Sequence, residues 1–322
     1  MELTNSIKDK VVERLLAEFE QKAACAPDKK KYSQAEFARM IALRHGIKFD
    51  KAVLPQIKKE QGRNYNAINE VSWLVLARHY NVLSTSAWNT ARTKAYITVQ
   101  AQLGACQRYG IWQVLCDRAG IGKSYAAVSY ARANKNVFYV DCSEFPSKGD
   151  FITCLAGQFG LEKTGSYNQL WREVTNELLL LDCPLLILDE FGDCADAVVT
   201  LMKGLYNKAN AGDRIMLGCY FIGADNLQKN LIDGKRMRKP SYAEFWSRFN
   251  EKVTNLGYDK TPAGYREELR GEIEKIAVAN LPEIEEGVDK VVEETLKTGA
   301  VRATQKEIAK LRMLGTDKYM RL

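Results

Sequence analysis

One stretch of this chain combines residue types and spacing that could hold a polyphosphate. It is Asp117-Arg-Ala-Gly-Ile-Gly-Lys-Ser124, and it directly follows the apolar run 111–116. A strand that enters a glycine-rich turn and then opens a helix points several backbone N–H groups and the positive helix end at one place. The stretch therefore predicts an ATP-binding loop. The residues expected to contact the nucleotide are Arg118, Ala119, Gly120, Ile121, Gly122, Lys123, Ser124 and Tyr125.

Two side chains of this loop have specific chemistry. Lys123 adds a positive charge that suits the β- and γ-phosphates, and the Ser124 hydroxyl can ligate the Mg²⁺ that accompanies ATP. The loop departs from the usual pattern G-x-x-x-x-G-K-[ST] at one position, where Asp117 replaces the first glycine. Its carboxylate either repels phosphates or faces away from them, and the sequence leaves both possibilities open.

A second motif, Pro184-Leu-Leu-Ile-Leu-Asp-Glu190, is a short apolar run that ends in two carboxylates. As a buried strand of the same parallel sheet, it would place Asp189 at the strand's carboxyl end beside the loop, where it can hold Mg²⁺ through water. Glu190 can then orient and deprotonate an attacking water. The simpler interpretation is a buried strand that ends in an exposed acidic turn. Together, the two motifs indicate a P-loop ATPase.

Size and composition limit the class of protein. The 322 residues are enough for two or three domains, and 47 Lys and Arg against 40 Asp and Glu give a net charge of +7. This mild excess permits contact with nucleic acid or acidic lipid without proving either. The eight cysteines contain no C-x-x-C pair, which is typical of reduced thiols. No signal peptide or membrane-spanning run is recognisable, so we expect a soluble, cytoplasmic protein.

The order of expected elements indicates an α/β fold with helical regions on either side. Residues 1–80 read as an all-helical domain, 81–95 as a linker, 96–260 as the α/β core and 261–322 as a helical domain. Apolar runs in the core predict strands at 111–116, 136–142, 184–189 and 214–222, with helices at about 122–134, 148–158, 167–181 and 195–209. Such alternation is typical of a doubly wound parallel sheet with its ligand at the strands' carboxyl ends. A Thr261-Pro262 start signal predicts further helices at about 262–279, 283–297 and 302–314.

The first 80 residues have the outline of a helix-turn-helix domain. Ser33-Gln-Ala-Glu36 is a capping box, Gly46 marks a turn, and a second short helix around 53–57 precedes a third at 66–80. In this interpretation the residues that face DNA are Gln56, Lys58, Lys59 and Arg63. A small helical bundle with a solvated basic face would give the same pattern, and the pattern does not show which helix enters a groove.

Four motifs occur in a specific order: Ala119-Gly-Ile-Gly-Lys-Ser124, Leu186-Ile-Leu-Asp-Glu190, Phe245-Trp-Ser-Arg-Phe249 and Gly299-Ala-Val-Arg302. In this order and spacing the chain resembles the AAA+ ATPases that assist DNA transposition, a family that includes the phage Mu B protein, IstB and TnsC. The likeness covers most of the chain. It implies an AAA+ P-loop core, an N-terminal helix-turn-helix domain and a C-terminal helical lid.

The resemblance also implies roles for residues that spacing alone does not assign. Arg248 matches the arginine finger that reaches the ATP of a neighbouring subunit, so activity would require assembly. Arg302 matches the sensor that touches the γ-phosphate. Each of these arginines could instead be a surface salt-bridge partner. After the fourth strand the family usually has a polar sensor where this chain has Ala224, so Asp225 or Asn226 must substitute, or the sensor is weak.

Proteins of this family assemble on double-stranded DNA as rings or helical filaments and stimulate a transposase. A similar role needs a DNA surface that is independent of sequence, and the densest basic cluster is Lys235, Arg236, Arg238 and Lys239, expected in a loop before the helix of Arg248. That cluster could equally be solvated or contact another subunit. Two other functions stay open: a helicase loader or replication initiator, and a DNA-binding switch that holds ATP but scarcely hydrolyses it.

Overall fold

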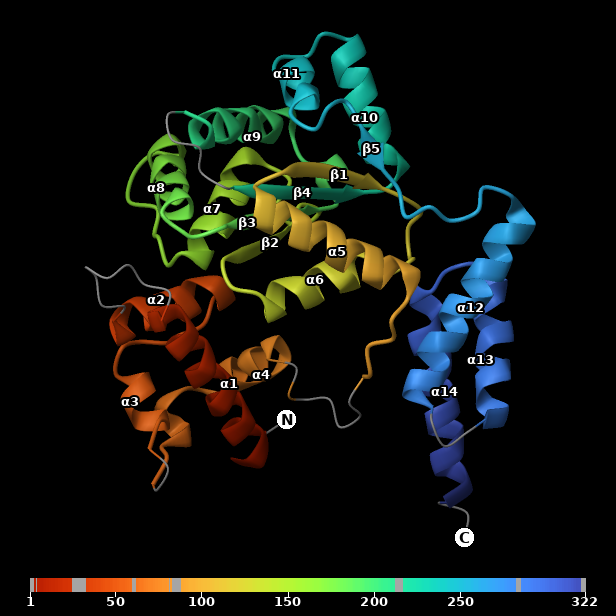
Figure 1. Cartoon of the computed structure of the whole chain (residues 1–322). Coiled ribbons are helices and arrows are strands. Elements are labelled where there is room, and N and C mark those ends of the chain that lie inside the picture. The colour runs from red at the N-terminus through yellow and green to blue at the C-terminus, as the bar shows by residue number, and fades with distance from the viewer. Residues whose placement is uncertain are drawn as a thin grey trace. The chain divides into compact units, whose positions relative to one another are not determined.

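The computed structural model describes residues 3, 5–24, 33–59, 62–80, 82, 88–211, 217–281 and 285–319, with backbone alone at 285, 286 and 312–319. Contacts divide the chain into two compact units. Unit 1 comprises Met1–Ala87 and Ile152–Leu178, and unit 2 comprises Trp88–Phe151 and Leu179–Leu322. Figure 1 labels the elements of both.

Unit 1 is helical. Its elements are α1 (Asn5–Ala24), α2 (Gln34–His45), α3 (Val53–Ile57), η1 (Tyr65–Ala67), α4 (Glu70–His79), most of α7 (Lys148–Gln158) and most of α8 (Tyr167–Leu179). The capping box of α2 is confirmed, because Ser33 and Glu36 each bond the other's backbone N–H. Phe37, Ile41 and Trp73 are fully buried and join α2 and α4 in one core.

The two sequence segments of unit 1 touch closely at Gly160. A Cβ added to this residue would lie 3.3 Å from the Cα of Met40 in α2. The Gly160 backbone also has a φ of 71°, which favours glycine. An ion pair of 3.3 Å between Arg39 and Glu162 lies at the same contact. Residues 152–178 therefore belong to the packing of the N-terminal helices.

Unit 2 contains a five-stranded parallel sheet with the strand order β2-β3-β4-β1-β5. The strands are β1 (Trp112–Cys116), β2 (Val137–Asp141), β3 (Leu185–Asp189), β4 (Gly218–Gly223) and β5 (Val253–Thr254). The register pairs Asp141 with Asp189 and Cys116 with Gly223, so the carboxyl ends of these four strands meet at one edge. The predicted α/β fold with a parallel sheet is thus confirmed.

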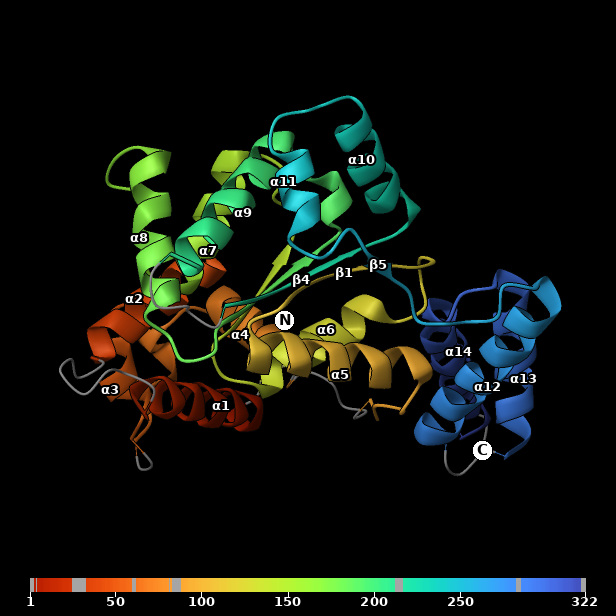
Figure 2. The ribbon, with the colours of Figure 1, turned by 45° about the horizontal axis from the view of Figure 1, so that its top comes forward.

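Helices cover both faces of this sheet (Figure 2). One face carries α5 (Lys94–Tyr109) and α6 (Lys123–Ala133), and the other carries α9 (Asp196–Ala209), α10 (Asp225–Arg236) and α11 (Tyr242–Ser247). Double coverage explains why β3 and β4 are apolar runs with every residue buried.

Three C-terminal helices, α12 (Pro262–Asn280), α13 (Glu285–Thr298) and α14 (Arg302–Tyr319), pack side by side around a core of their own (Figure 1). The predicted start of the first is confirmed, since Thr261 accepts a hydrogen bond from the Gly264 N–H and Pro262 is the first helical residue. We call α12–α14 the lid.

The sequence prediction does not include helix α5, helix α10 or strand β5 of unit 2. Helix α5 has ordinary signals, because the Thr93 side chain caps its start and Gly110, with a φ of 59°, ends it. Strand β5 has only two half-buried residues, too few for a periodic pattern. No helix among the described residues combines the length and apolar character needed to cross a membrane.

Candidate nucleotide-binding site

The glycine-rich loop connects β1 to α6 at the carboxyl edge of the sheet. Gly120 and Gly122 have φ values of 77° and 98°, a backbone region that other residues rarely adopt. Gly122 is the N-cap of α6, and no side chain caps that helix. The first N–H groups of α6 are therefore available to an anion, as the loop pattern predicts.

Lys123 is the first residue of α6 and is buried. Its Nζ donates hydrogen bonds to the carbonyl oxygens of Asp117 (2.7 Å) and Arg118 (2.8 Å), so the amino group lies across the loop. Burial lowers the pKa of Lys123, and the charges of Asp117, Glu190 and Asp189 oppose that effect. The charges of both carboxylates of the second motif thus act on Lys123.

Asp189 is the last residue of β3 and only 2 % exposed. Its Oδ1 accepts the N–H of Glu190 at 3.0 Å, and its Oδ2 accepts the Tyr139 hydroxyl at 2.8 Å. Glu190 has a left-handed backbone with a φ of 47°, an uncommon conformation that is found often at functional sites. Burial, and then the nearby Asp189 charge, raise the pKa of the Glu190 carboxyl.

The oxygen donors at this edge suit Mg²⁺, which prefers carboxylate, hydroxyl and water ligands. Asp189 supplies a buried carboxylate and Ser124 a partly exposed hydroxyl at the start of α6. Tyr125, next in the helix, is 46 % exposed, and its hydroxyl lies 2.6 Å from the Thr90 hydroxyl. Arg118 and Ala119 are exposed, and Ile121 is buried.

The carboxylate of Asp117 has partners inside the protein. Its Oδ2 accepts the N–H of Leu256 at 2.7 Å, and its Oδ1 accepts the N–H of Arg118 at 2.8 Å. It thereby ties the loop to the segment that follows β5. Of the two alternatives left by the sequence, the hydrogen bonds favour a carboxylate that is turned to the backbone.

The end of β4 lies next to the loop, because the Asp117 N–H donates to the Gly223 carbonyl at 3.3 Å. The following Ala224 has no polar side chain, and Asp225 and Asn226 are exposed at the start of α10. The Asn226 amide donates to Asp193 at 3.2 Å. Asn226 is thus engaged with the turn after Glu190, while the charge of Asp225 acts on Cys116 at the end of β1.

The lid touches the loop directly. The N–H of Arg302, at the start of α14, donates to the Gly120 carbonyl at 3.0 Å, and a Cβ on Gly120 would lie 3.0 Å from that of Ala300. The Arg118 guanidinium stacks 3.8 Å from the ring centroid of Tyr265 in α12. The Arg302 side chain is exposed. Lid and loop are therefore joined at two places within unit 2.

Arg248 directly follows α11, on the face of the sheet that α9, α10 and α11 cover. Its Nη2 donates to Asn207 Oδ1 at 2.9 Å, and its guanidinium lies 4.6 Å from the ring centroid of Tyr206, both in α9. Its Nε is buried without a hydrogen-bond partner among the described residues. The structure does not bring Arg248 together with Lys123 and Glu190 through any recorded contact.

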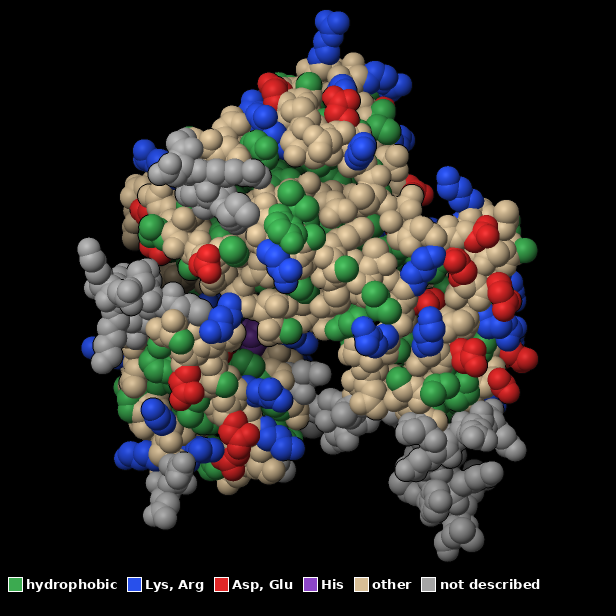
Figure 3. All heavy atoms as spheres, viewed as in Figure 1, with side chains coloured by type: hydrophobic (Ala, Val, Ile, Leu, Met, Phe, Trp, Pro, Cys, Tyr) green, Lys and Arg blue, Asp and Glu red, His purple; other side chains and the backbone are tan. Residues whose placement is uncertain are grey.

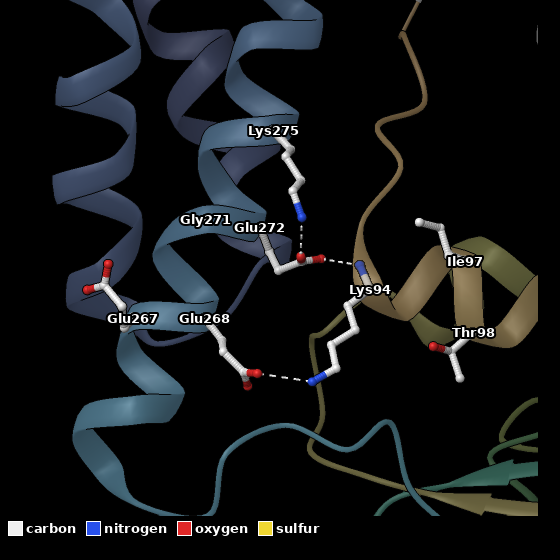
Figure 4. Close-up of a pocket in the computed structure, with 8 residues that line it drawn as sticks. All are labelled: Lys94, Ile97, Thr98, Glu267, Glu268, Gly271, Glu272 and Lys275. Atoms are coloured by element: carbon white, nitrogen blue, oxygen red, sulfur yellow. Dashed lines mark hydrogen bonds and ion pairs between the residues drawn. The ribbon is translucent and has the colours of Figure 1, made fainter.

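A cavity of about 520 Å³ lies between the start of α5 and α12 (Figure 4). Glu272, 4 % exposed, accepts the Lys94 N–H at 2.6 Å and pairs with Lys275 at 2.9 Å. The Lys94 amino group pairs with Glu268 at 3.0 Å. None of the predicted nucleotide residues lines this cavity. It marks the junction at which the lid holds the N-terminus of α5.

The predicted basic cluster is only partly a loop, which corrects the sequence interpretation. Lys235 and Arg236 end α10, whose buried Leu227, Leu231 and Gly234 have helical spacing, and Arg238 and Lys239 form the turn before α11. Lys and Arg side chains gather over this end of α10 and α11 in Figure 3. Three of the four pair with carboxylates: Lys235 with Glu251, Arg236 with Asp233 and Lys239 with Asp196.

The predicted DNA-facing residues of unit 1 differ in exposure. Gln56 is half-buried and accepts the Asn64 amide at 2.7 Å, and Arg63 pairs with Asp9. Lys58 and Lys59 are exposed just after α3, which has five residues. The structure therefore leaves the two lysines open to a ligand and engages the other two side chains internally.

Sequence reasoning misses Tyr139, the partner of Asp189. A tyrosine in an apolar strand is an ordinary core residue, and only the pairing of β2 with β3 brings its hydroxyl to the carboxylate. The Asp117 contact with Leu256 is missed for the same reason, since it depends on how β5 joins the sheet.

The family model described as "AAA domain" matches residues 113–231. Cdc6p from Pyrobaculum aerophilum is similar, with a TM-score of 0.46 and 15 % identity over 62 % of this chain and 53 % of that one. A RuvB variant from Thermotoga maritima is also similar, with a TM-score of 0.42 and 17 % identity over 71 % of this chain and 65 % of that one.

The chain thus spans about half the length of Cdc6p, 53 %. At these scores and identities, the structural likenesses say nothing of what this chain binds or acts on. No curated protein matches its sequence. The family match stands by itself and includes the loop, Asp189 and Glu190. Residues 113–231 of this chain are therefore an AAA domain.

Proposed function

We propose that this chain is an ATP hydrolase that binds ATP with Mg²⁺ at the carboxyl edge of its sheet. One observation carries the proposal: Lys123, at the uncapped start of α6, lies within the electrostatic influence of both Asp189 and Glu190. A cation, an anion-binding helix end and two carboxylates then share one site. That combination suits phosphoryl transfer to water.

Each residue has a definite part in this reaction. The N–H groups around Gly120 and Gly122 and the Lys123 amino group bind the phosphates, for which Lys123 exchanges its two carbonyl partners. Ser124 and Asp189 hold Mg²⁺, which when bound neutralises phosphate charge. Glu190 accepts the proton of the attacking water, and its raised pKa makes it a better base than an ordinary carboxylate.

Two arginines complete the proposal. Arg302 reports the nucleotide to the lid, since its backbone already touches the loop at Gly120. Arg248 acts on the ATP of a neighbouring subunit and so makes turnover depend on assembly into a ring or helical filament. Its exposure is partial and its guanidinium is oriented by Asn207 and Tyr206. Such a finger supplied in trans is worth about 10³–10⁵ in rate.

The proposed setting is double-stranded DNA, on which the assembly directs a transposase. This part rests on the family resemblance, the net charge of +7 and the exposed basic residues of α10–α11 and unit 1. A DNA-bound switch with weak hydrolysis is the second candidate. One observation favours it: the residue after β4 is Ala224, whose side chain cannot form a hydrogen bond with a phosphate or a water.

The test is ATP turnover of the full chain, with and without duplex DNA, over a range of protein concentrations. Wild type is expected to have a low turnover rate that rises with duplex DNA and with protein concentration. Glu190→Gln is expected to bind ATP without turnover. Arg248→Ala is expected to lose the dependence of turnover on protein concentration. Equal turnover by wild type and Glu190→Gln would overturn the catalytic assignment. Wild type that binds ATP and DNA without turnover would favour the switch. Stimulation by a replicative helicase in place of a transposase would favour the loader.

A further inference from the structure

Both oxygens of the Asp189 carboxylate are held by hydrogen bonds of different origin. Oδ1 accepts the N–H of Glu190 at 3.0 Å, a local contact. Oδ2 accepts the Tyr139 hydroxyl at 2.8 Å from the neighbouring strand β2, where Tyr139 lies opposite Ile187 in the register. Asp189 is 2 % exposed, so water does not compete freely for these positions. The carboxylate therefore has a fixed orientation before any cation arrives.

The tyrosine is well suited to this contact. Its hydroxyl donates to Asp189 Oδ2 at 2.8 Å, and its ring is carried by the neighbouring strand β2, which is paired with β3 along its whole length. A carboxylate oxygen has lone pairs for both a hydrogen bond and a cation. Partners of this kind orient metal-binding carboxylates, and their loss typically costs about 10–100-fold in metal affinity.

We infer that Tyr139 is a positioning residue for Mg²⁺, acting through Asp189. The inference rests on the proposed nucleotide site and adds a residue that touches neither nucleotide nor cation. Tyr139 fixes the rotation of the carboxylate, so that Asp189 meets Mg²⁺ without first losing rotational freedom. Lys123 and the loop N–H groups bind phosphate independently of this contact.

The experiment measures ATP binding to the full chain by calorimetry at a series of Mg²⁺ concentrations. Tyr139→Phe removes one hydroxyl and keeps the ring. The half-saturating Mg²⁺ concentration is expected to rise about 10-fold or more, while ATP affinity in excess EDTA stays at the wild-type value. Tyr130→Phe is the matched control, because Tyr130 is also a buried tyrosine, and its hydroxyl donates to Gln107 at 2.7 Å. It should leave both quantities unchanged.

A double variant separates positioning from general loss of structure. Asp189→Asn alone should raise the half-saturating Mg²⁺ concentration. Adding Tyr139→Phe to it should cause no further rise, because the two residues act as one unit. A wild-type Mg²⁺ midpoint in Tyr139→Phe, or a full additional loss in the double variant, would overturn the inference. Wild type that binds no ATP even in millimolar Mg²⁺ would instead overturn the proposed function, and this inference with it.

Discussion

At the scale of single residues, Asp117 replaces a glycine and gains a structural task. Its carboxylate accepts two backbone N–H groups, those of Leu256 and Arg118. An acceptor that satisfies a partly buried N–H group is expensive to remove, because the donor is left without a partner. The residue that looks unfavourable for phosphate binding in the sequence is thus part of the support of the loop.

We expect Asp117→Ala to lower the free energy of unfolding by about 1–3 kcal/mol and to change ATP affinity little. Urea unfolding and ATP titration measure the two effects. Asp289→Ala, on the exposed side of α13, is the control and should change neither quantity. A large gain in ATP affinity for Asp117→Ala would mean that the carboxylate repels phosphate.

The two histidines of the chain meet in unit 1, with His45 and His79 ring centroids 4.4 Å apart. Burial, and then the His79 and Arg44 charges, lower the pKa of His45 from 6.5 to about 3, although Glu18 opposes them. Between these values the unfolded chain binds a proton that the folded chain does not. His45 therefore reduces stability as pH falls below 6.5 and has no effect above it.

Proton NMR of the full chain tests this directly, since only two imidazole signals exist. One signal should not titrate above about pH 4, and His45→Gln identifies it by its absence. The free energy of unfolding of wild type should fall by about 1–2 kcal/mol from pH 6.5 to 5, a fall that His45→Gln lacks. A midpoint near 6.5 for both signals would contradict the buried, neutral His45.

At the scale of elements, the lid is attached to α5 by a buried carboxylate. Glu272 accepts the first N–H of α5 and pairs with Lys275, and a negative charge at a helix N-terminus is favourable. Glu272→Ala should therefore cost about 1.5–3 kcal/mol of unfolding free energy, the range for a hydrogen bond to a charged group. Chemical denaturation measures it. Glu267→Ala, five residues earlier on α12 and exposed, should have little effect. Equal losses in both variants would mean that the contacts of Glu272 with Lys94 and Lys275 do not account for the loss.

The sequence predicts most elements of the sheet, because strands buried on both faces are continuous apolar runs. β1 to β4 all lie within predicted runs, apart from one residue at the end of β4, Gly223. β5 cannot be predicted from the sequence, since its two residues form a strand only through pairing with β1. Helix α10 also escapes prediction, although Leu227, Leu231 and Gly234 repeat with helical spacing.

The candidate site divides in the same way. Lys123, Asp189 and Glu190 can be singled out from the sequence, because they follow two predicted strands, and in the structure the two carboxylates act on the charge of Lys123. Tyr139 and Leu256 are not, since their roles arise from neighbours that are distant in sequence. The parts proposed for Arg248 and Arg302 stay predictions, as do the boundaries of the predicted domains.

At the scale of the whole molecule, the exposed charges bear on the proposed contact with DNA. Arg238 is exposed in the turn after α10, and it is the member of the basic cluster for which the described residues record no ion pair. It is thus the most available to a phosphate. The paired members must exchange a carboxylate first, although exposed pairs hold together only weakly.

Arg238→Ala should weaken duplex binding for all sequences alike and reduce the slope of log affinity against log salt by about 0.9. Fluorescence anisotropy over a range of salt concentrations measures this. Arg270→Ala, an exposed arginine of α12, removes the same charge elsewhere and should leave the slope unchanged. Equal slopes for wild type and Arg238→Ala would remove this turn from the DNA surface.

The close approach of Gly160 to Met40 has a consequence for synthesis of the chain. Unit 1 needs residues 152–178, and the ribosome delivers them only after all of 88–151 has been made. Helices α1–α4 leave the ribosomal exit tunnel before residues 152–178 are made. The apolar surface around Met40 therefore stays exposed to chaperones until residues 152–178 emerge. Translation speed through β1, α6 and β2 thus sets how long the nascent N-terminal region stays incomplete.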